Sequence, residues 1–159
     1  MFVEDLPAWN AHIRSSATLR QMPKRHFVDP SLACAILRLD KTKLLDDLEY
    51  FGLLFESLVI RDLRIYAQTF NGRIRHYRDS SGLEVDAIVE NNVGDYLAIE
   101  VKLGFASADT AAANLKKFAA RIDTTRTPAP RALVVITANG FAHRRADGVY
   151  VIPLTTITA

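Results

Sequence analysis

Two short segments near the middle of the chain alternate between apolar and polar residues. They span residues 83–90 (LEVDAIVE) and 96–102 (YLAIEVK), and the loop between them, residues 91–95, contains Asn, Gly and Asp. Alternation rich in β-branched residues predicts strands, and a short loop of this composition predicts a hairpin. The alternation places Leu83, Val85, Ala87, Val89, Leu97, Ile99 and Val101 on apolar faces, and Glu84, Asp86, Ile88, Glu90, Tyr96, Ala98, Glu100 and Lys102 on the opposite faces.

The predicted register brings acidic side chains together. With the loop symmetric about Val93, Asp86 lies across from Glu100, and Glu84 lies across from Lys102. Cross-strand Cβ atoms are only ~5 Å apart, so two carboxylates there repel by roughly 3 kcal/mol at an effective dielectric of about 20. A divalent cation between them, with the Lys102 ammonium alongside, would offset this repulsion. A metal site is therefore the hypothesis that this hairpin raises.

Periodicity predicts further elements on both sides of the hairpin. Asp29 reads as an N-cap followed by proline, and the break at residues 41–43 separates this first helix from a longer one. Glu56 interrupts the apolar stretch LLFESLVI of the longer helix and is expected near the edge of its buried face. We expect strands at residues 26–28, 72–78, 132–136 and 148–154, and helices at residues 29–39, 44–67 and 107–122. A strand–helix–strand order after Glu100 indicates a parallel crossover, hence an α/β fold with a mixed central sheet flanked by helices.

The N-terminal segment has no clear period. We interpret residues 1–23 as a connector or the remnant of a longer chain, and residues 24–159 as the folded domain. Phe2, Leu6, Trp9 and Ile13 could form an apolar stripe on a short helix in this segment.

Composition narrows the class of protein only slightly. The 159 residues fit one domain, with 49% apolar and 24% charged residues, and a net charge of +2 neither requires nor excludes a nucleic-acid partner. The first residues lack the apolar core of a signal peptide, and no apolar run approaches the ~20 residues needed to cross a bilayer. With a single cysteine, Cys34, the chain is expected in the cytoplasm, without a membrane association.

The acidic residues indicate a chemistry. Carboxylates of Glu56, Asp86 and Glu100 suit Mg²⁺ or Mn²⁺, which activates water and neutralises charge on a phosphate. Lys102, two residues after Glu100, could orient the attacking water or stabilise the transition state. The competing interpretation is a set of ordinary cross-strand ion pairs, including Glu84 with Lys102. The chain has no Walker A loop or GxGxxG stretch, no zinc-type histidine spacing, and no nucleophile–histidine pairing.

These residues carry a family resemblance. The set Glu56, Asp86 and Glu100-Val101-Lys102, in an αβββαβ order, resembles the restriction endonuclease-like PD-(D/E)XK nuclease superfamily. The segments KRHFVDPSLA, GLLFESLVIRDL, YRDSSGLEVDAIV and AIEVKLG look more closely like the domain of unknown function 4143 family. In that family the module is similar to a nuclease domain and follows an AAA-type ATPase domain.

The resemblance implies roles for the four residues. Asp86 and Glu100 would be metal ligands, Lys102 the catalytic lysine, and Glu56 would complete the site from the helix. Val85 stands where the superfamily has proline, a change without chemical consequence because the proline carries no chemistry.

Two functions remain open at this point. The first is a Mg²⁺-dependent nuclease, with DNA as the expected substrate and Arg73, Arg75 and Arg78 contacting phosphates. The second is a non-catalytic nucleic-acid-binding or assembly module of an ATPase system, which would present an exposed apolar surface near residues 1–23. Either function leaves a homo-oligomer open.

Overall fold

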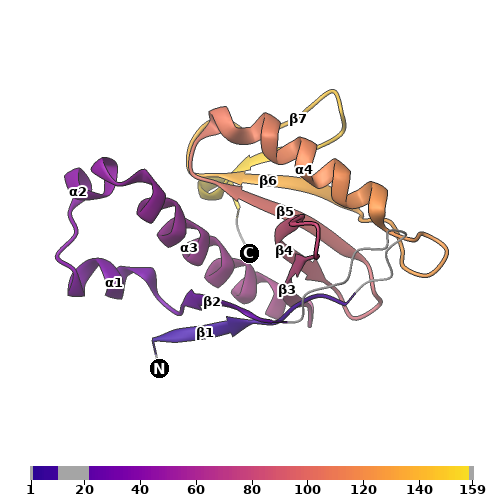
Figure 1. The fold of residues 1–159 in the computed structure, drawn as a ribbon, viewed down its shortest axis with the longest axis horizontal. Helices are drawn as coiled ribbons and strands as arrows, with labels where there is room; N and C mark the ends of the chain where they lie inside the picture. The colour runs from indigo at the N-terminus through magenta and orange to yellow at the C-terminus, as the bar shows by residue number, and fades with distance from the viewer. Residues whose placement is uncertain (1, 11–21, 158–159) are drawn as a thin grey trace.

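A six-stranded mixed sheet forms the centre of the molecule (Figure 1). The computed structural model describes residues 2–10 and 22–157. The strand order is β3-β4-β5-β6-β8-β7, with parallel pairs β5/β6 and β6/β8 and antiparallel pairs elsewhere. Its strands are β3 (Arg73–Arg78), β4 (Glu84–Glu90), β5 (Tyr96–Lys102), β6 (Ala132–Thr137), β7 (His143–Arg144) and β8 (Tyr150–Pro153). The predicted α/β class, the mixed sheet and the parallel crossover from β5 to β6 are confirmed.

The helices that precede the main sheet begin after aspartate N-caps. Asp29 accepts a hydrogen bond from the Ser31 amide ahead of α1, as predicted. Asp40 and Asp47 cap two further helices, so the predicted break at residues 41–43 is wrong, because Lys41 instead begins α2. The helices are α1 (Pro30–Ile36), α2 (Lys41–Asp46), α3 (Leu48–Gln68) and α4 (Ala108–Arg121), with short 3₁₀ turns η1 (Phe105–Ser107) and η2 (Leu154–Thr156). No helix among residues 2–10 and 22–157 is both long and apolar enough to cross a membrane.

The two long helices cover opposite faces of the sheet (Figure 1). This three-layer arrangement gives two apolar cores, because each sheet face is buried against its own helix. The α3 core contains Phe55, Val59, Ile60, Leu63, Ala87, Val89, Ile99 and Val101. The α4 core contains Ala111, Leu115, Phe118, Ile122, Val85, Ile88, Tyr96 and Ala98. Helical spacing predicts that Ala111, Leu115, Phe118 and Ile122 face inward, and all four are buried.

The N-terminal segment contributes to both cores. The strand β1 (Val3–Leu6) pairs antiparallel with β2 (Lys24–Phe27), so a short helix predicted there is wrong. Leu6 is buried in the α3 core, whereas Trp9 is buried in the α4 core and contacts Tyr96. Ile13, the last residue of the predicted stripe, lies outside the described residues.

An irregularity in β4 changes the predicted side-chain alternation. The hairpin register, with Ala87 opposite Ile99, is the one expected for symmetry about Val93. Between β3 and β4, however, the pairing shifts so that Asp86 and Ala87 both stand opposite His76. Such a bulge puts an extra residue into one strand, and Val85 consequently lies in the α4 core with Ile88, not with Ala87 as predicted.

The β3–β4 turn contains a buried carboxylate. Asp79 is fully buried and accepts hydrogen bonds from Tyr77 Oη, the Ser81 amide and hydroxyl, and the Leu83 amide, and it pairs with Arg121 of α4. Burial alone would raise the pKa of Asp79, but the hydrogen bonds outweigh burial and lower it. The turn is thereby fastened to the last turn of α4.

We predict that Asp79→Asn lowers the free energy of unfolding by about 3 kcal/mol at neutral pH, because it leaves Arg121 and several donors without their charged acceptor. The contribution of a carboxylate with a lowered pKa is present above its ordinary pKa and disappears as the pH falls through the folded value. Urea denaturation at pH 7 measures the loss. The control Asp95→Asn, which removes an exposed pair with Arg131, should cost less than about 1 kcal/mol. Equal losses in the two variants would contradict the prediction.

Candidate functional site

Asp86 and Glu100 are buried where the β4–β5 ladder ends, beyond the pair Ala87–Ile99. Their exposed fractions are only 8% and 4%. Instead of continuing the ladder, Asp86 Oδ2 accepts a hydrogen bond from the Val101 amide at 2.9 Å. Glu100 Oε1 accepts one from Asn114 Nδ2 of α4 at 2.7 Å. Each carboxylate is therefore held in a fixed orientation by a neighbouring element.

The two carboxylates belong to different sides of the sheet. Glu100 accepts a hydrogen bond from Asn114 of α4, on the face where its place in the alternation puts it. Asp86 instead accepts a hydrogen bond from Lys24 of the β1/β2 pair. The predicted common face for Asp86 and Glu100 is therefore wrong, because the bulge turns Asp86 away from it. The sequence was nevertheless right that the two carboxylates lie close together, since Lys102 contacts both.

Lys102 connects the pair. Its Nζ lies 2.9 Å from Glu100 Oε2 and 3.9 Å from Asp86 Oδ2. The carboxylates raise the pKa of Lys102 by more than burial lowers it, so the side chain stays charged. Lys102 thus places a positive charge beside the two carboxylates at the C-terminal end of β5.

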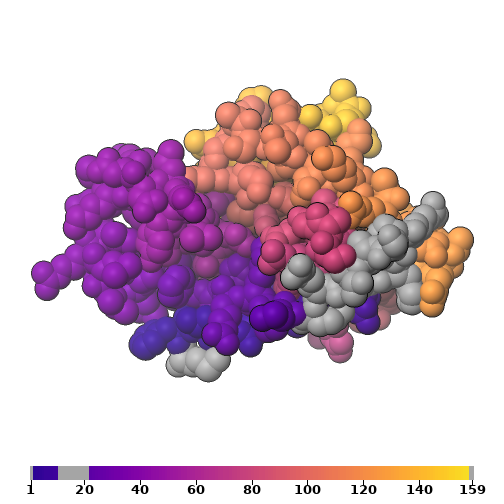
Figure 2. Space-filling model, viewed as in Figure 1, coloured from indigo at the N-terminus to yellow at the C-terminus, as the bar shows by residue number. Residues whose placement is uncertain are grey.

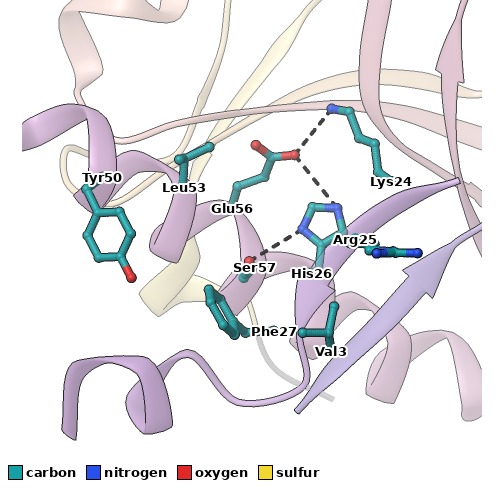
Figure 3. Close-up of a pocket in the computed structure, with 9 residues that line it drawn as sticks. All are labelled: Val3, Lys24, Arg25, His26, Phe27, Tyr50, Leu53, Glu56 and Ser57. Carbon is teal, nitrogen blue, oxygen red and sulfur yellow. Dashed lines mark hydrogen bonds and ion pairs between the residues drawn. The ribbon is translucent and has the colours of Figure 1, made fainter. Parts of the chain in front are cut away.

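Glu56 reaches the same cluster from α3 through a residue that sequence reasoning missed. Lys24 Nζ of β2 lies 3.4 Å from Glu56 Oε1 and 3.4 Å from Asp86 Oδ1, as well as 3.7 Å from Glu84 Oε2 (Figure 3 shows the first of these). The sequence contained one signal, the position of Lys24 at the start of KRHFVDPSLA, but nothing local distinguishes it from a surface lysine. The partner of Glu56 at the edge of the buried face of α3 is therefore a lysine that lies 32 residues away in the sequence.

The charged residues on β3 are largely paired. Arg78 Nε lies 2.6 Å from Glu84 Oε1, and Arg75 donates to Glu90 at 2.8 Å. Glu84 therefore pairs with Arg78 and Lys24, not with Lys102 as the competing interpretation expected. Arg73 is exposed. The role of these arginines in nucleic-acid binding stays a prediction.

Burial and mutual repulsion alter the ionisation of the cluster. Burial, with the charge of Asp86 second, raises the pKa of Glu100 to about 7. The same two causes raise the pKa of Glu56. Raised carboxyl pKa values together with fixed ammonium groups are typical of functional sites, where the charges have been brought together despite their repulsion.

The donor set fits a hard divalent cation. Mg²⁺ is usually held by one or two carboxylates, with waters and substrate phosphate completing its shell. Asp86 and Glu100 supply such a pair. Within the described part of the chain, no three His, Cys, Asp or Glu side chains are gathered around one point, and the Lys24 ammonium lies between Glu56 and Asp86. The role of Glu56 as a third ligand stays a prediction.

We predict a pH signature for Glu100 in EDTA. Between about pH 4.5 and pH 7 the folded protein retains a proton on Glu100 that the unfolded chain releases, so stability falls as the pH rises through this window. Glu100→Gln lacks this dependence. Its free energy of unfolding, relative to wild type, should therefore rise by about 3 kcal/mol between pH 4.5 and pH 8, as measured by urea denaturation. A difference between wild type and Glu100→Gln that stays constant with pH would contradict this assignment.

Comparison with known protein families gives one match. The model of the family described as "Domain of unknown function (DUF4143)" matches residues 51–157, which include most of α3, the β3–β5 strands, α4 and the strands that follow. Comparisons with curated proteins and with solved structures gave no match. Because the family match covers more than half of the 159 residues, the chain belongs to the DUF4143 family.

Proposed function

We propose that this chain is a divalent-metal-dependent nuclease that hydrolyses phosphodiester bonds in nucleic acid, with DNA as the expected substrate. The observation that carries the proposal is the contact of one ammonium group, Lys102 Nζ, with two buried carboxylates, Asp86 and Glu100. Ion pairs that serve stability alone rarely place two buried carboxylates beside one ammonium group.

The order of the elements supports a nuclease-like core. Helix α3 is followed by the hairpin strands β3, β4 and β5, then by α4 and β6, which is the αβββαβ order of the PD-(D/E)XK superfamily that the sequence resembles. In this assignment Asp86 and Glu-X-Lys (Glu100 to Lys102) occupy the positions of the signature motif. The bulge at Asp86 accounts for how the first carboxylate turns toward the α3 side.

Each residue of the site would have a separate role in the reaction. Asp86 and Glu100 would hold Mg²⁺ or Mn²⁺, with Glu56 completing the site from α3. The bound ion would supply an acidified water and a counter-charge for the phosphate. Lys102 would orient the attacking water or stabilise the negative charge that develops on the phosphate. The Val101 amide and Asn114 hold the two carboxylates in place, and Lys24 places a second positive charge near the position of the phosphate.

We predict that wild-type protein cleaves plasmid or single-stranded DNA in Mg²⁺ or Mn²⁺, and that EDTA abolishes cleavage. Asp86→Asn and Lys102→Ala should each lower the rate by about 100-fold or more, because each removes a charge from the site. Two variants of exposed residues, Asp46→Asn at the end of α2 and Lys117→Ala on α4, are matched controls and should retain the wild-type rate. Gel electrophoresis of the products measures the cleavage rate of all five proteins.

The controls also detect contaminating nuclease, which would give all five preparations the same activity. Equal cleavage by wild type, Asp86→Asn and Lys102→Ala would therefore refute the proposed roles. Folded wild-type protein that cleaves none of these substrates would refute the view that this chain alone is a nuclease.

An assembly module is the second candidate function, and one observation favours it. Helices α1 and α2 form a lobe beside the N-terminal half of α3, purple at the left of Figure 2, whose surface carries several exposed apolar side chains. Those on or between the helices are Leu32, Ile36, Leu37, Leu45 and Leu48. Phe2 and Met22, close to the segment where the sequence led us to expect such a surface, are exposed as well. Apolar surfaces of this kind commonly mark protein–protein contacts.

If this lobe joins copies of the chain, Ile36→Glu should convert a dimer or larger oligomer into a monomer, because it places a charge among the exposed apolar side chains. Sedimentation velocity measures the change, and Ile65→Glu, on the exposed side of α3, is the control. A wild-type protein that is monomeric at high concentration would rule out self-assembly through the lobe.

A further inference from the structure

A pocket of about 500 Å³ adjoins the carboxylate cluster (Figure 3). It lies between β2 and the N-terminal half of α3. Lys24 and Glu56 belong both to its lining and to the carboxylate cluster, so the pocket and the proposed catalytic centre share a wall. Whatever occupies the pocket would therefore lie next to a phosphate bound at Asp86.

The rest of the lining is mostly apolar. Val3, Phe27, Tyr50 and Leu53 form this apolar part of the lining (Figure 3). Aromatic and aliphatic walls suit the flat face of a nucleobase, which binds by stacking and by exclusion of water. The volume is sufficient for one nucleotide.

Polar groups are placed at the inner end of the pocket. His26 is 6% exposed, and its Nε2 is buried with no hydrogen-bond partner among the described residues, 3.9 Å from Glu56 Oε1. Its Nδ1 lies 3.5 Å from Ser57 Oγ. Burial and the charge of Lys24 lower the pKa of His26 to about 4, so the ring is neutral and the Glu56 contact is not an ion pair. A buried ring nitrogen without a hydrogen-bond partner is unusual in folded proteins. The His26 nitrogen therefore indicates that a polar group of a ligand binds at this end of the pocket.

Positive charge lies at the rim. Lys24 and Arg25 are neighbours on β2, and both line the pocket. Lys24 faces the carboxylates, whereas Arg25 is highly exposed and pairs with Asp5 at 3.4 Å. These two cations suit the phosphates on either side of a nucleotide whose base enters the pocket.

We propose that this pocket binds the unpaired nucleotide next to the scissile phosphate, so that the substrate is single-stranded nucleic acid or a frayed strand end. This inference rests on the nuclease function proposed above. A base within a duplex is stacked on both faces and hydrogen-bonded along one edge, so it could enter only after leaving the helix. Single-stranded DNA and RNA offer the same chemistry to the pocket, and the test includes both.

The test measures binding separately from cleavage. Fluorescence anisotropy in the presence of Ca²⁺ would measure the affinity for labelled oligothymidine, oligouridine and a matched DNA duplex, each of about 12 nucleotides. Gels would confirm that the probes stay intact during the measurement. Leu53→Trp fills the pocket, and Ile65→Trp is its matched control, because both residues lie on α3 with similar exposed fractions, 56% and 53%.

We expect Leu53→Trp to weaken binding of a single strand about tenfold or more, as loss of one stacked base would. Duplex binding should not change, and Ile65→Trp should bind single strands like wild type to within about threefold. The stronger of the oligothymidine and oligouridine complexes shows whether the DNA or the RNA strand is bound more tightly.

Equal single-strand affinity in Leu53→Trp and Ile65→Trp would overturn the pocket assignment while leaving the nuclease proposal intact, provided that wild type cleaves and Asp86→Asn does not. Preferential binding of the duplex would overturn the assignment as well. A wild-type protein that neither binds nor cleaves any of these nucleic acids would overturn both proposals together.

Discussion

Burying carboxylates at the end of a β-hairpin is the constraint on which the rest of this structure depends. Asp86 and Glu100 leave water at a place where no further ladder pairing follows, and buried charges are tolerated only when partners surround them. Here the partners come from every neighbouring element. The Val101 amide, Asn114 of α4, Lys102 of β5 and Lys24 of β2 each contact one or both carboxylates.

This requirement explains why the N-terminal ribbon belongs to the site. The β1/β2 pair is separate from the main sheet, yet it supplies Lys24 to the carboxylates and His26 to the adjoining pocket. Burial of Leu6 in the α3 core and an Arg64–Glu4 ion pair hold the ribbon against α3. A segment without clear periodicity in the sequence thereby becomes one wall of the proposed catalytic centre.

The sequence predicted what depends on local pattern. Alternation identified β4 and β5 and their register, and acidic caps and helical spacing identified α1 and the inward face of α4. It could not predict the bulge at Asp86, because that irregularity depends on how β3 and β4 pair across the turn at Asp79. Nor could it identify Lys24, whose partners are 32 and 62 residues away along the chain. The bulge depends on pairing between two strands, and the role of Lys24 depends on contacts distant in sequence, so neither follows from the pattern within one strand.

The long separation between Lys24 and Asp86 also has a consequence for the order of folding. The contact between Asp86 and Val101 spans 15 residues, whereas that between Lys24 and Asp86 spans 62, and contacts that close longer loops carry a larger entropic cost. The hairpin can therefore form before the ribbon docks, and at that stage its carboxylates lack one ammonium partner. Docking of the β1/β2 ribbon then adds the Lys24 ammonium group. The charges of the site are therefore balanced only late in folding.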